Sequence, residues 1–279
     1  MNFGGTPLGD TASRRMQRAW SGIRRPVSGE RRPAGCSTLR YTDRHMNLTD
    51  KIALVTGGSA GIGRAIAESL IGAGAKVAIT GRDRAKLERT AEAIGAHAIQ
   101  ADVAQEADVE RTYQELLAAF GDLDMLINNA GVGVFKPLVE MDQASFERVI
   151  ATNVTGAMLM GREAAKLFVA RNRGNIVNIA STASLRGAAG GTAYMTSKFA
   201  LRGMTECWRA ELRKHNVRVM QINPSEVITD FASAAGFAQT DHPSKLQSED
   251  IAHMVKAVIE MDDRGFTTEL TVFATNPAS

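Results

Sequence analysis

The residues with the clearest chemical potential in this chain are a tyrosine, a lysine and a serine. Tyr194 and Lys198 stand four positions apart in a segment with helical spacing of apolar residues, which places both side chains on one face with about 5–6 Å between their Cβ atoms. A free phenol has a pKa near ~10. A neighbouring ammonium and a helix N-terminus both favour the phenolate, so we expect Lys198 to lower the pKa of Tyr194. Ser181, after an apolar run, could hydrogen-bond the same substrate oxygen, and the three residues predict an acid–base site.

The chain around these residues alternates between apolar runs and helical spacing from residue 51 onward. Expected strands cover residues 52–56, 76–80, 96–100, 125–128, 176–180 and 217–222. Expected helices cover residues 62–72, 85–94, 106–120, 142–171 and 193–214. Apolar strands joined by crossover helices predict a parallel sheet covered on both faces, a doubly wound α/β (Rossmann) fold in one domain over residues 46–279. Ligands of such sheets bind beyond the carboxyl ends of the strands.

A glycine-rich turn joins the first expected strand to the first expected helix. Gly57, Gly61 and Gly63 give the spacing GxxxGxG, and their missing side chains let the backbone approach a pyrophosphate at a helix N-terminus. The alternative is that the glycines only serve a tight joint between strand and helix. Because the turn stands directly between a strand and a helix, we favour dinucleotide binding.

The end of the second expected strand indicates which dinucleotide is bound. An acidic residue at this tip would hydrogen-bond a ribose 2′-hydroxyl and repel a 2′-phosphate, whereas this chain has Gly81 followed by Arg82. The pattern favours NADP(H). NAD is the alternative if Arg82 is only a solvated turn residue.

The composition argues against several other classes of protein. No window comes close to the ~18 consecutive apolar residues of a membrane span, which predicts a soluble protein. Cys36 and Cys207 are far apart, and the five histidines show no ligand spacing. We therefore expect neither a disulfide framework nor a metal site. The cysteine usage fits a reducing compartment, so we expect a cytoplasmic location.

The net charge of +3 is unevenly distributed along the chain. Residues 1–45 hold nine of the 33 basic and three of the 30 acidic side chains, which leaves the remainder with 24 basic and 27 acidic side chains and a net charge of −3. A mildly acidic core does not indicate nucleic-acid binding.

Residues 1–45 are rich in Arg, Gly, Pro and Ser and lack an apolar period, which predicts a disordered extension. One interpretation is an upstream-start artefact or an inert tail, because Met46 leads directly into the first strand. A second is a segment that targets the protein to an organelle. A third is an arm that binds nucleic acid, which salt-sensitive binding lost on deletion of this segment would support.

Together these motifs resemble those of the short-chain dehydrogenase/reductase family, in its group of single-domain enzymes. The resemblance is close over residues 48–229. The matching pieces in chain order are the turn from Thr56 to Gly63, Asp102 with Val103, the Asn-Asn-Ala-Gly run at 128–131, Asn153, Ser181, Tyr194, Lys198, and Asn223 with Pro224. The step of thirteen residues from Ser181 to Tyr194 also matches the usual spacing of the family.

The resemblance implies a role for each catalytic residue. Tyr194 would donate or accept the proton at the substrate carbonyl or hydroxyl, and Ser181 would hold that oxygen. Lys198 would lower the tyrosine pKa and bind the nicotinamide ribose. Asn153 would hold a water that continues a proton relay from the lysine. The implied activity is reversible hydride transfer between NADP(H) and a small-molecule carbonyl compound or secondary alcohol, without a metal.

The resemblance also implies a set of cofactor contacts. Asp102 and Val103 would contact the adenine, and residues 129–131 would flank the adenosine ribose. Pro224 and Val227 would orient the nicotinamide carboxamide. The full implied set is Gly57, Ser59, Gly61, Ile62, Gly63, Arg82, Asp102, Val103, Asn129, Ala130, Gly131, Tyr194, Lys198, Pro224, Val227 and Thr229.

Several of these residues have structural alternatives. Asn129 could satisfy backbone groups at a strand end, Asp102 could only cap the following helix, and Asn153 could mark a kink. Ser59 is a candidate for the 2′-phosphate together with Arg82, and it could equally be a turn residue.

After Pro224 the chain departs from the family pattern, because many members carry Gly where this chain has Ser225 and Glu226. A specific substrate therefore does not follow from the resemblance. Substrate contacts are expected from residues 132–135, 183–191 and a flap at 231–246. The apolar character of the flap suggests a 3-oxoacyl compound or a related ketone.

The motifs leave two alternative functions open, and the resemblance implies that the chain forms an oligomer. The alternatives are an NAD-preferring alcohol dehydrogenase and a dinucleotide-binding sensor or scaffold without turnover, which is expected to lack Tyr194 or Lys198. The resemblance implies a homodimer or homotetramer that pairs the helices bearing Asn153 and Tyr194. The small residues expected to allow close approach there are Gly156, Ala157, Gly161 and Ala165.

Overall fold

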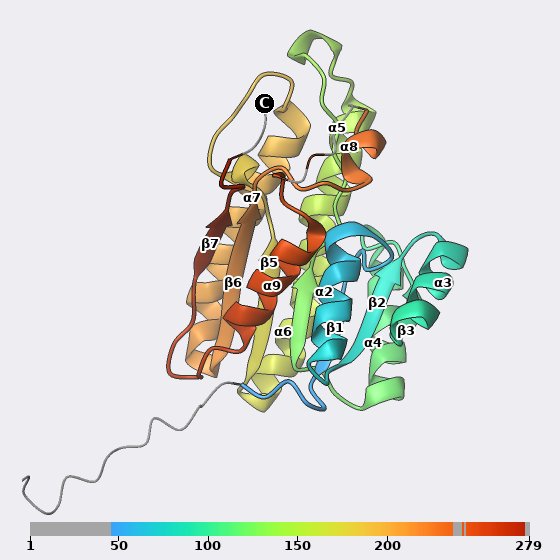
Figure 1. Ribbon diagram of the computed structural model, residues 1–279, viewed down its shortest axis with the longest axis vertical. Helices are drawn as coiled ribbons and strands as arrows, with labels where there is room; N and C mark the ends of the chain where they lie inside the picture. The colour runs from blue at the N-terminus through green and yellow to red at the C-terminus, as the bar shows by residue number, and fades with distance from the viewer. Residues whose placement is uncertain (1–45, 237–241, 243, 277–279) are drawn as a thin grey trace, which may run out of the picture. The chain divides into compact units, whose positions relative to one another are not determined.

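Seven parallel strands form one sheet in the order β3-β2-β1-β4-β5-β6-β7 (Figure 1). The structure is a computed structural model that describes residues 46–236, 242 and 244–276. The strands are β1 (Ile52–Val55), β2 (Lys76–Gly81), β3 (His97–Gln100), β4 (Met125–Asn128), β5 (Gly174–Ile179), β6 (Val217–Pro224) and β7 (Glu269–Val272). The predicted doubly wound parallel sheet is confirmed. The predicted extension at residues 1–45 lies outside the described residues.

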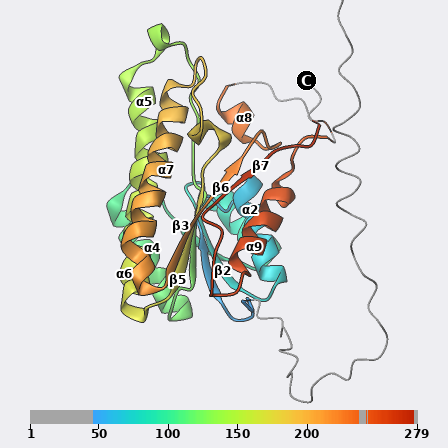
Figure 2. The ribbon, with the colours of Figure 1, turned by 90° about the vertical axis from the view of Figure 1, so that its left-hand side faces the viewer.

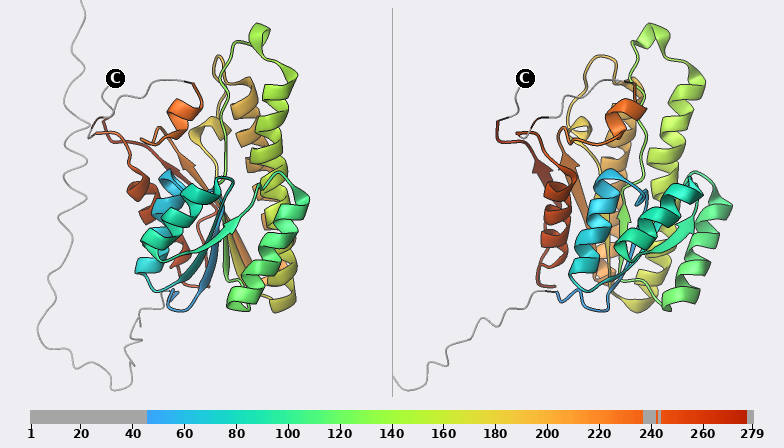
Figure 3. Two further views of the ribbon diagram at one scale, coloured as in Figure 1. Left: turned by 90° about the vertical axis from the view of Figure 1, so that its right-hand side faces the viewer. Right: turned by 45° about the vertical axis from the view of Figure 1, so that its right-hand side comes forward.

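Helices cover both faces of the sheet (Figures 2 and 3). One face carries α2 (Gly61–Gly72), α3 (Arg84–Ile94) and α9 (Ser248–Ile259), and the other carries α4 (Glu106–Phe120), α6 (Ala157–Arg171) and α7 (Thr192–Leu212). Shorter helical elements are α5 (Gln143–Ile150), α8 (Phe231–Ala234), η1 (Leu138–Glu140), η2 (Ala151–Gly156), η3 (Thr182–Ser184) and η4 (Arg213–His215). In the part of the chain that the structure describes, no helix combines the length and apolar character that crossing a membrane requires.

Successive side chains of a strand point to opposite faces of the sheet, and this alternation divides the core into two parts. Ala53 and Val55 of β1 belong to the cluster beneath α2, α3 and α9, whereas Ile52 and Leu54 belong to the cluster beneath α4, α6 and α7. Every residue of β1, β4, β5 and β6 is buried. Full burial of a large apolar side chain stabilises the fold by about 1.5–3 kcal/mol, which explains why these strands are nearly continuous apolar runs.

The direction of winding reverses between β1 and β4, which are hydrogen-bonded neighbours. From this pair the chain proceeds outward to β2 and β3 on one side and to β5, β6 and β7 on the other. The crevice beyond the carboxyl ends of strands at such a reversal is the usual ligand site of this fold. The glycine-rich turn after β1 and the Asn-Asn-Ala-Gly run after β4 both begin at this crevice.

The single helix expected over residues 142–171 is three consecutive segments. The α-helical α5 passes into a π-helical turn, η2, and then into α6. The chain thus stays helical while its hydrogen bonds shift by one residue. Asn153 lies within this π-helical turn, a feature found mostly at functional sites.

The small residues of this segment pack within the chain. A Cβ at Gly156 would lie 2.7 Å from Val103, and one at Gly161 would lie 2.9 Å from Trp208. Ala157 is buried against the core. Contacts inside the chain account for these three small residues. Their predicted role in a contact between subunits stays a prediction.

Helix α9 is not among the helices that the sequence analysis predicts. It begins with a capping box in which Asp250 accepts the backbone N–H of Gln247 at 2.8 Å. Ile251, Val255 and Ile259 are fully buried and pack in the core cluster that includes α2. The spacing of four between these residues is a helical pattern that the sequence does contain.

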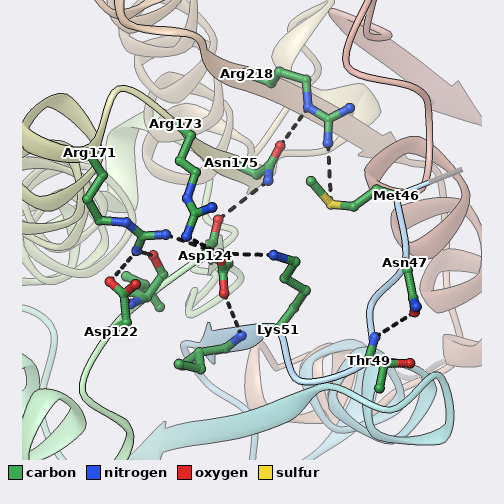
Figure 4. Close-up of polar contacts among 12 residues, drawn as sticks. Met46, Asn47, Thr49, Lys51, Asp122, Asp124, Arg171, Arg173, Asn175 and Arg218 are labelled. Carbon is green, nitrogen blue, oxygen red and sulfur yellow. Dashed lines mark hydrogen bonds and ion pairs between the residues drawn. The ribbon is translucent and has the colours of Figure 1, made fainter. Parts of the chain in front are cut away.

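A polar cluster holds the strands together at their amino ends, opposite the crevice (Figure 4). Asp124 pairs with Arg171 at 3.1 Å. The buried Arg218 donates to Asn175 Oδ1 at 2.7 Å and to the carbonyl of Ile259, at the end of α9, at 2.9 Å. These charges are compensated by protein groups, so the cluster joins β4, β5, β6, α6 and α9 and leaves the crevice to the other end of the sheet.

Candidate active site

Ser181, Tyr194 and Lys198 converge at the carboxyl end of β5. Ser181 is the N-cap of η3, where its Oγ accepts the N–H of Ala183 at 3.1 Å. Tyr194 lies in the first turn of α7, and Ser181 hydrogen-bonds its phenol. One turn later, Lys198 Nζ lies 5.6 Å from the centre of the Tyr194 ring. The structure therefore brings together the three residues that the sequence predicts.

Burial dominates the ionisation of these groups. It raises the pKa of Tyr194 to about 12, against the opposing effect of the hydrogen bond with Ser181. Burial also lowers the pKa of Lys198 to about 8, and its Nζ donates to the carbonyl of Ile179 at 3.0 Å. The expected lowering of the tyrosine pKa by Lys198 is not met in this structure, because low-dielectric surroundings disfavour both charged forms. Tyr194 is accordingly a protonated phenol at neutral pH.

Asn153 braces the loop after β4 against α7. Its Oδ1 accepts the N–H of Val132 at 2.8 Å, and its Nδ2 donates to the carbonyl of Val132 and to Ser197 Oγ, both at 2.9 Å. Ser197 Oγ in turn donates to the carbonyl of Tyr194 at 2.6 Å. Asn153 thus holds two walls of the crevice in register, and its role in a water relay stays a prediction.

The turn after β1 has the geometry that a dinucleotide site requires. Gly57 and Gly61 have φ values of 64° and 51°, a region that residues with a Cβ rarely occupy. A Cβ at Gly63 would collide with Asn129 and with the backbone of Gly57. The N-cap of α2 is Ala60, whose side chain offers no acceptor to the first N–H groups of the helix. An anion can take that place.

Asn129 and Thr56 tie the two loops of the crevice together. Asn129 Nδ2 donates to the carbonyl of Thr56 at 2.9 Å, and Thr56 Oγ1 accepts the N–H groups of Asn129 and Ala130 at 3.0 Å. The structural role foreseen for Asn129 is thereby confirmed, and the same contacts set the distance between the turn after β1 and the loop after β4.

The first turn of α3, just after the tip of β2, carries a second basic residue that the sequence analysis misses. Arg82 lines the crevice, and a Cβ at Gly81 would lie 3.2 Å from Ser59 Oγ, which places Ser59 beside this tip. Lys86, in the first turn of α3, also lines the crevice and pairs with Asp230 at 3.6 Å. A lysine four residues after Arg82 is visible in the sequence. Its approach to Asp230 is not.

A cleft of about 680 Å³ runs from the glycine turn to Tyr194, within the ~300–1,000 Å³ typical of ligand sites. The predicted residues that line it are Gly57, Gly61, Ile62, Arg82, Asn129, Ala130, Gly131, Ser181, Tyr194, Lys198, Pro224, Val227 and Thr229. The predicted residues outside its lining are Ser59, Gly63, Asp102, Val103 and Asn153. Within the described ranges, no three His, Cys, Asp or Glu side chains gather closely enough to hold a metal ion.

Asp102 and Val103 have structural roles at the start of α4. Asp102 Oδ1 accepts the N–H of Ala104 at 3.0 Å, which forms the turn that leads into the helix. Val103 is buried and packs against Gly156. Their predicted contact with an adenine stays a prediction.

Two aromatic rings enclose Tyr194. The ring centres of Phe135 and Phe231 lie 5.2 and 5.4 Å from that of Tyr194, and a Cβ at Gly133 would lie 2.7 Å from Phe231. These contacts help explain why the phenol is so poorly solvated. Phe135 and Phe231 both fall within segments predicted to contact substrate.

The flap is tied to the residues after β6 at its carboxyl end. Val227 and Leu246 form a parallel bridge, and Lys245 pairs with Glu226 at 2.9 Å. Glu226, the departure from the family pattern, lines the cleft with its charge compensated by this lysine. Residues 237–241 and 243 of the predicted flap lie outside the described residues. Residues 183–191 are not part of the cleft lining, and residues 185–189 are exposed. Their predicted contact with substrate stays a prediction.

The fold and the glycine turn are those of a dinucleotide-binding α/β protein, and comparisons with known proteins agree. Residues 51–239 match the family model described as short chain dehydrogenase. The chain is 38% identical over 185 residues to a sorbitol dehydrogenase of Cereibacter sphaeroides, covering 65% of this chain and 72% of the relative.

Solved structures give the same assignment. A 3-ketoacyl-(acyl-carrier-protein) reductase from Brucella melitensis complexed with NADH superposes with a TM-score of 0.77 at 29% identity, over 82% of this chain and 98% of that one. A metagenomic short-chain oxidoreductase in complex with NADP gives a TM-score of 0.72 at 34% identity, over 83% and 100%. This chain belongs to the short-chain dehydrogenase family and is an oxidoreductase that acts on CH–OH groups with NAD(P).

Proposed function

We propose that the protein reduces a carbonyl compound, or oxidises the corresponding secondary alcohol, with Tyr194 as the proton donor or acceptor. The observation that best supports this proposal is the convergence of Ser181, Tyr194 and Lys198 at one end of a cleft whose other end is the glycine turn. In reduction, the protonated phenol of Tyr194 donates its proton to the substrate oxygen, and Ser181 hydrogen-bonds that oxygen. Lys198 stabilises the phenolate that results.

NADP(H) is the proposed cofactor, with NAD(H) as the alternative. When bound, it supplies or accepts the hydride at the substrate carbon. Gly57 and Gly61 leave room for a pyrophosphate at the start of α2, and Lys198 would bind the nicotinamide ribose. Arg82 and Lys86 would hold a 2′-phosphate, a task that suits cations at the tip of β2.

We further propose a 3-oxoacyl compound or a related ketone as substrate, the reacting carbonyl lying against Tyr194 between the rings of Phe135 and Phe231. The likeness to a 3-ketoacyl reductase supports this choice. The likeness to a sorbitol dehydrogenase supports an alcohol as the other member of the substrate pair. The proposed arrangement is a domain at residues 46–279 preceded by an extension, in a cytoplasmic homodimer or homotetramer.

The proposed role of Tyr194 is tested by Tyr194→Phe. The substitution keeps the ring that packs between Phe135 and Phe231 and removes the hydroxyl whose proton is transferred, so turnover is expected to fall by at least about 10²–10⁴-fold. Turnover is followed by the loss of NADPH absorbance over a panel of ketones. NADPH binding, followed by its fluorescence, is expected to stay nearly unchanged. Wild-type rates in the variant would remove the acid–base assignment.

A further inference from the structure

The charged side chains that line the cleft divide into compensated and uncompensated ones. The lining residues are Arg82, Lys86, Arg148, Lys198, Glu226 and Asp230. Lys86 pairs with Asp230, and Glu226 pairs with Lys245. Lys198 is buried and donates to a backbone carbonyl. In the described part of the chain, no side-chain hydrogen bond or ion pair is formed by Arg82 or by Arg148. The cleft therefore presents two uncompensated cations.

These two arginines serve different parts of the cleft. Arg82 follows β2, at the end where the cofactor is proposed to carry its 2′-phosphate. Arg148 lies on α5, which stands beyond the carboxyl ends of the strands on the side of the cleft opposite α8 (Figure 2). Val132, Gly133 and Phe135 line the cleft together with it. These residues belong to the segment proposed to contact the substrate.

The position of Arg148 along its helix indicates how far it lies from Tyr194 and Lys198 at the base of the cleft. Asn153 lies near the base of the cleft, because a Cβ at Gly131 would lie 3.4 Å from Asn153 Oδ1 and 3.8 Å from Lys198 Nζ. Arg148 precedes Asn153 by five residues, which at about 1.5 Å per residue places its backbone roughly 7 Å further along the helix. A substrate group that contacts its guanidinium would therefore lie several bonds away from the reacting carbon.

We propose that Arg148 binds an anionic group, a carboxylate or a phosphate, on the substrate. This inference rests on the proposed carbonyl or alcohol chemistry at Tyr194. The substrate would combine a C=O or CH–OH group at Tyr194, an apolar body beside Phe135 and Phe231, and an anion at Arg148. A planar guanidinium suits both anions because it can donate two parallel hydrogen bonds.

The carboxylates nearest to Arg148 on α5 do not form ion pairs with its guanidinium. Glu147, the acidic residue next to it on α5, accepts a hydrogen bond from Gln143 at 2.6 Å. Asp142, at the start of the same helix, is paired with Lys136 at 2.7 Å. Neither carboxylate is paired with Arg148, so its guanidinium is free to meet a ligand.

The test uses three ketones that share one aryl methyl ketone body: 4-acetylbenzoate, its methyl ester, and 4-acetylphenyl phosphate. For each, kcat/KM is measured with saturating NADPH, and affinity for the enzyme loaded with NADP⁺ is measured by calorimetry. Arg148 is exposed, so the loss of one charged hydrogen bond there is expected to weaken binding by about a factor of ten. In Arg148→Ala we expect the preference for an anionic ketone over the ester to fall about tenfold.

Controls separate a lost contact from a damaged protein. Arg148→Lys keeps the charge and should retain part of the preference. Arg213→Ala removes an exposed arginine of η4 outside the cleft lining and should leave the preference unchanged. The two anionic ketones distinguish a carboxylate from a phosphate. The group that Arg148 binds is the one for which the preference over the ester falls further in Arg148→Ala.

The outcomes distinguish this inference from the proposed function. An equal preference in wild type and Arg148→Ala, in both kinetics and affinity, would overturn the inference while leaving ketone reduction intact. Conversely, an affinity difference that Arg148→Ala abolishes, without turnover of any ketone, would support the anion site and count against the proposed chemistry.

Discussion

At the scale of single residues, the state of Tyr194 is set by what surrounds it more than by the lysine beside it. Two phenylalanine rings pack around the phenol, and burial raises its pKa to about 12. The spacing of Tyr194, Lys198 and Ser181 could be predicted from sequence because four residues make one helical turn. The ionisation could not, because Phe231 comes from a distant segment.

Lys198 gives a prediction for the pH dependence of the reaction. Its pKa of about 8 lies below its ordinary value because burial disfavours the charge, so the ammonium that binds the cofactor ribose is present below about pH 8 and lost above it. We expect kcat/KM for NADPH, which reports ionisations of the free enzyme, to fall as the pH rises through about 8. Tyr194 stays protonated over this range.

Lys198→Arg is the matched variant for this prediction. Arginine keeps its charge throughout the accessible pH range, so the decline near pH 8 should disappear even though the absolute rate is lower. A decline that persists unchanged in this variant would show that another group causes it.

Arg82 gives a prediction for the choice of cofactor. Loss of one charged contact to a 2′-phosphate should weaken NADPH binding about tenfold or more, whereas NADH carries no such phosphate. We expect Arg82→Ala to raise the Kd of NADPH and to leave the Kd of NADH nearly unchanged, as measured by nucleotide fluorescence. Equal weakening of both nucleotides would argue for a general effect on the turn. Lys86→Ala should act in the same direction.

At the scale of elements, the last strand supports the loop that carries Ser181. Ser184 Oγ lies 2.7 Å from the carbonyl of Ser181 and 3.1 Å from Oδ1 of the fully buried Asn223. Asn223 Nδ2 donates to Glu269 Oε1 of β7 at 2.7 Å, and Glu269 pairs with Arg202 of α7 at 3.3 Å. Strand β7 and helix α7 are thus joined to η3 through Asn223.

Glu269→Ala should therefore affect both stability and turnover. It removes the closest acceptor of the Asn223 amide, and an unsatisfied buried donor costs about 1–3 kcal/mol. We expect a lower free energy of unfolding in urea by about that amount, and a several-fold lower kcat at a temperature where the variant is folded. Glu269→Gln keeps an acceptor and should lose less. A variant Glu269→Ala as stable as wild type would contradict this account.

The elements themselves were predictable to different degrees. Residues 106–120 and 125–128 coincide with α4 and β4, because their apolar periods are strong and bounded by turn residues. The π-helical turn η2 and the pair formed by Lys86 and Asp230 were not predictable. The first is a one-residue change of hydrogen bonding. The second depends on how residue 230 lies relative to α3, which precedes it by more than a hundred residues in the chain.

At the scale of the whole molecule, the outer faces of α6 and α7 carry exposed apolar residues. Phe199 is 44% exposed and Val169 37% exposed, and the exposed Gly203 and Cys207 continue the stripe of Phe199 along α7 at intervals of four. The two helices cover the same face of the sheet (Figure 2). This stripe is the surface we propose for the pairing of subunits, since apolar side chains there gain from burial.

Phe199→Asp tests this assembly. A carboxylate at the centre of a buried helix pair carries a desolvation cost that a solvated face does not, so the variant should dissociate into monomers while keeping the circular dichroism spectrum of the wild type. Molar mass is measured by light scattering coupled to size exclusion. Val139→Asp is the matched control, because Val139 is 93% exposed on η1, away from α6 and α7. A wild-type monomer would exclude the proposed assembly, and dissociation by Val139→Asp alone would place the subunit contact at η1.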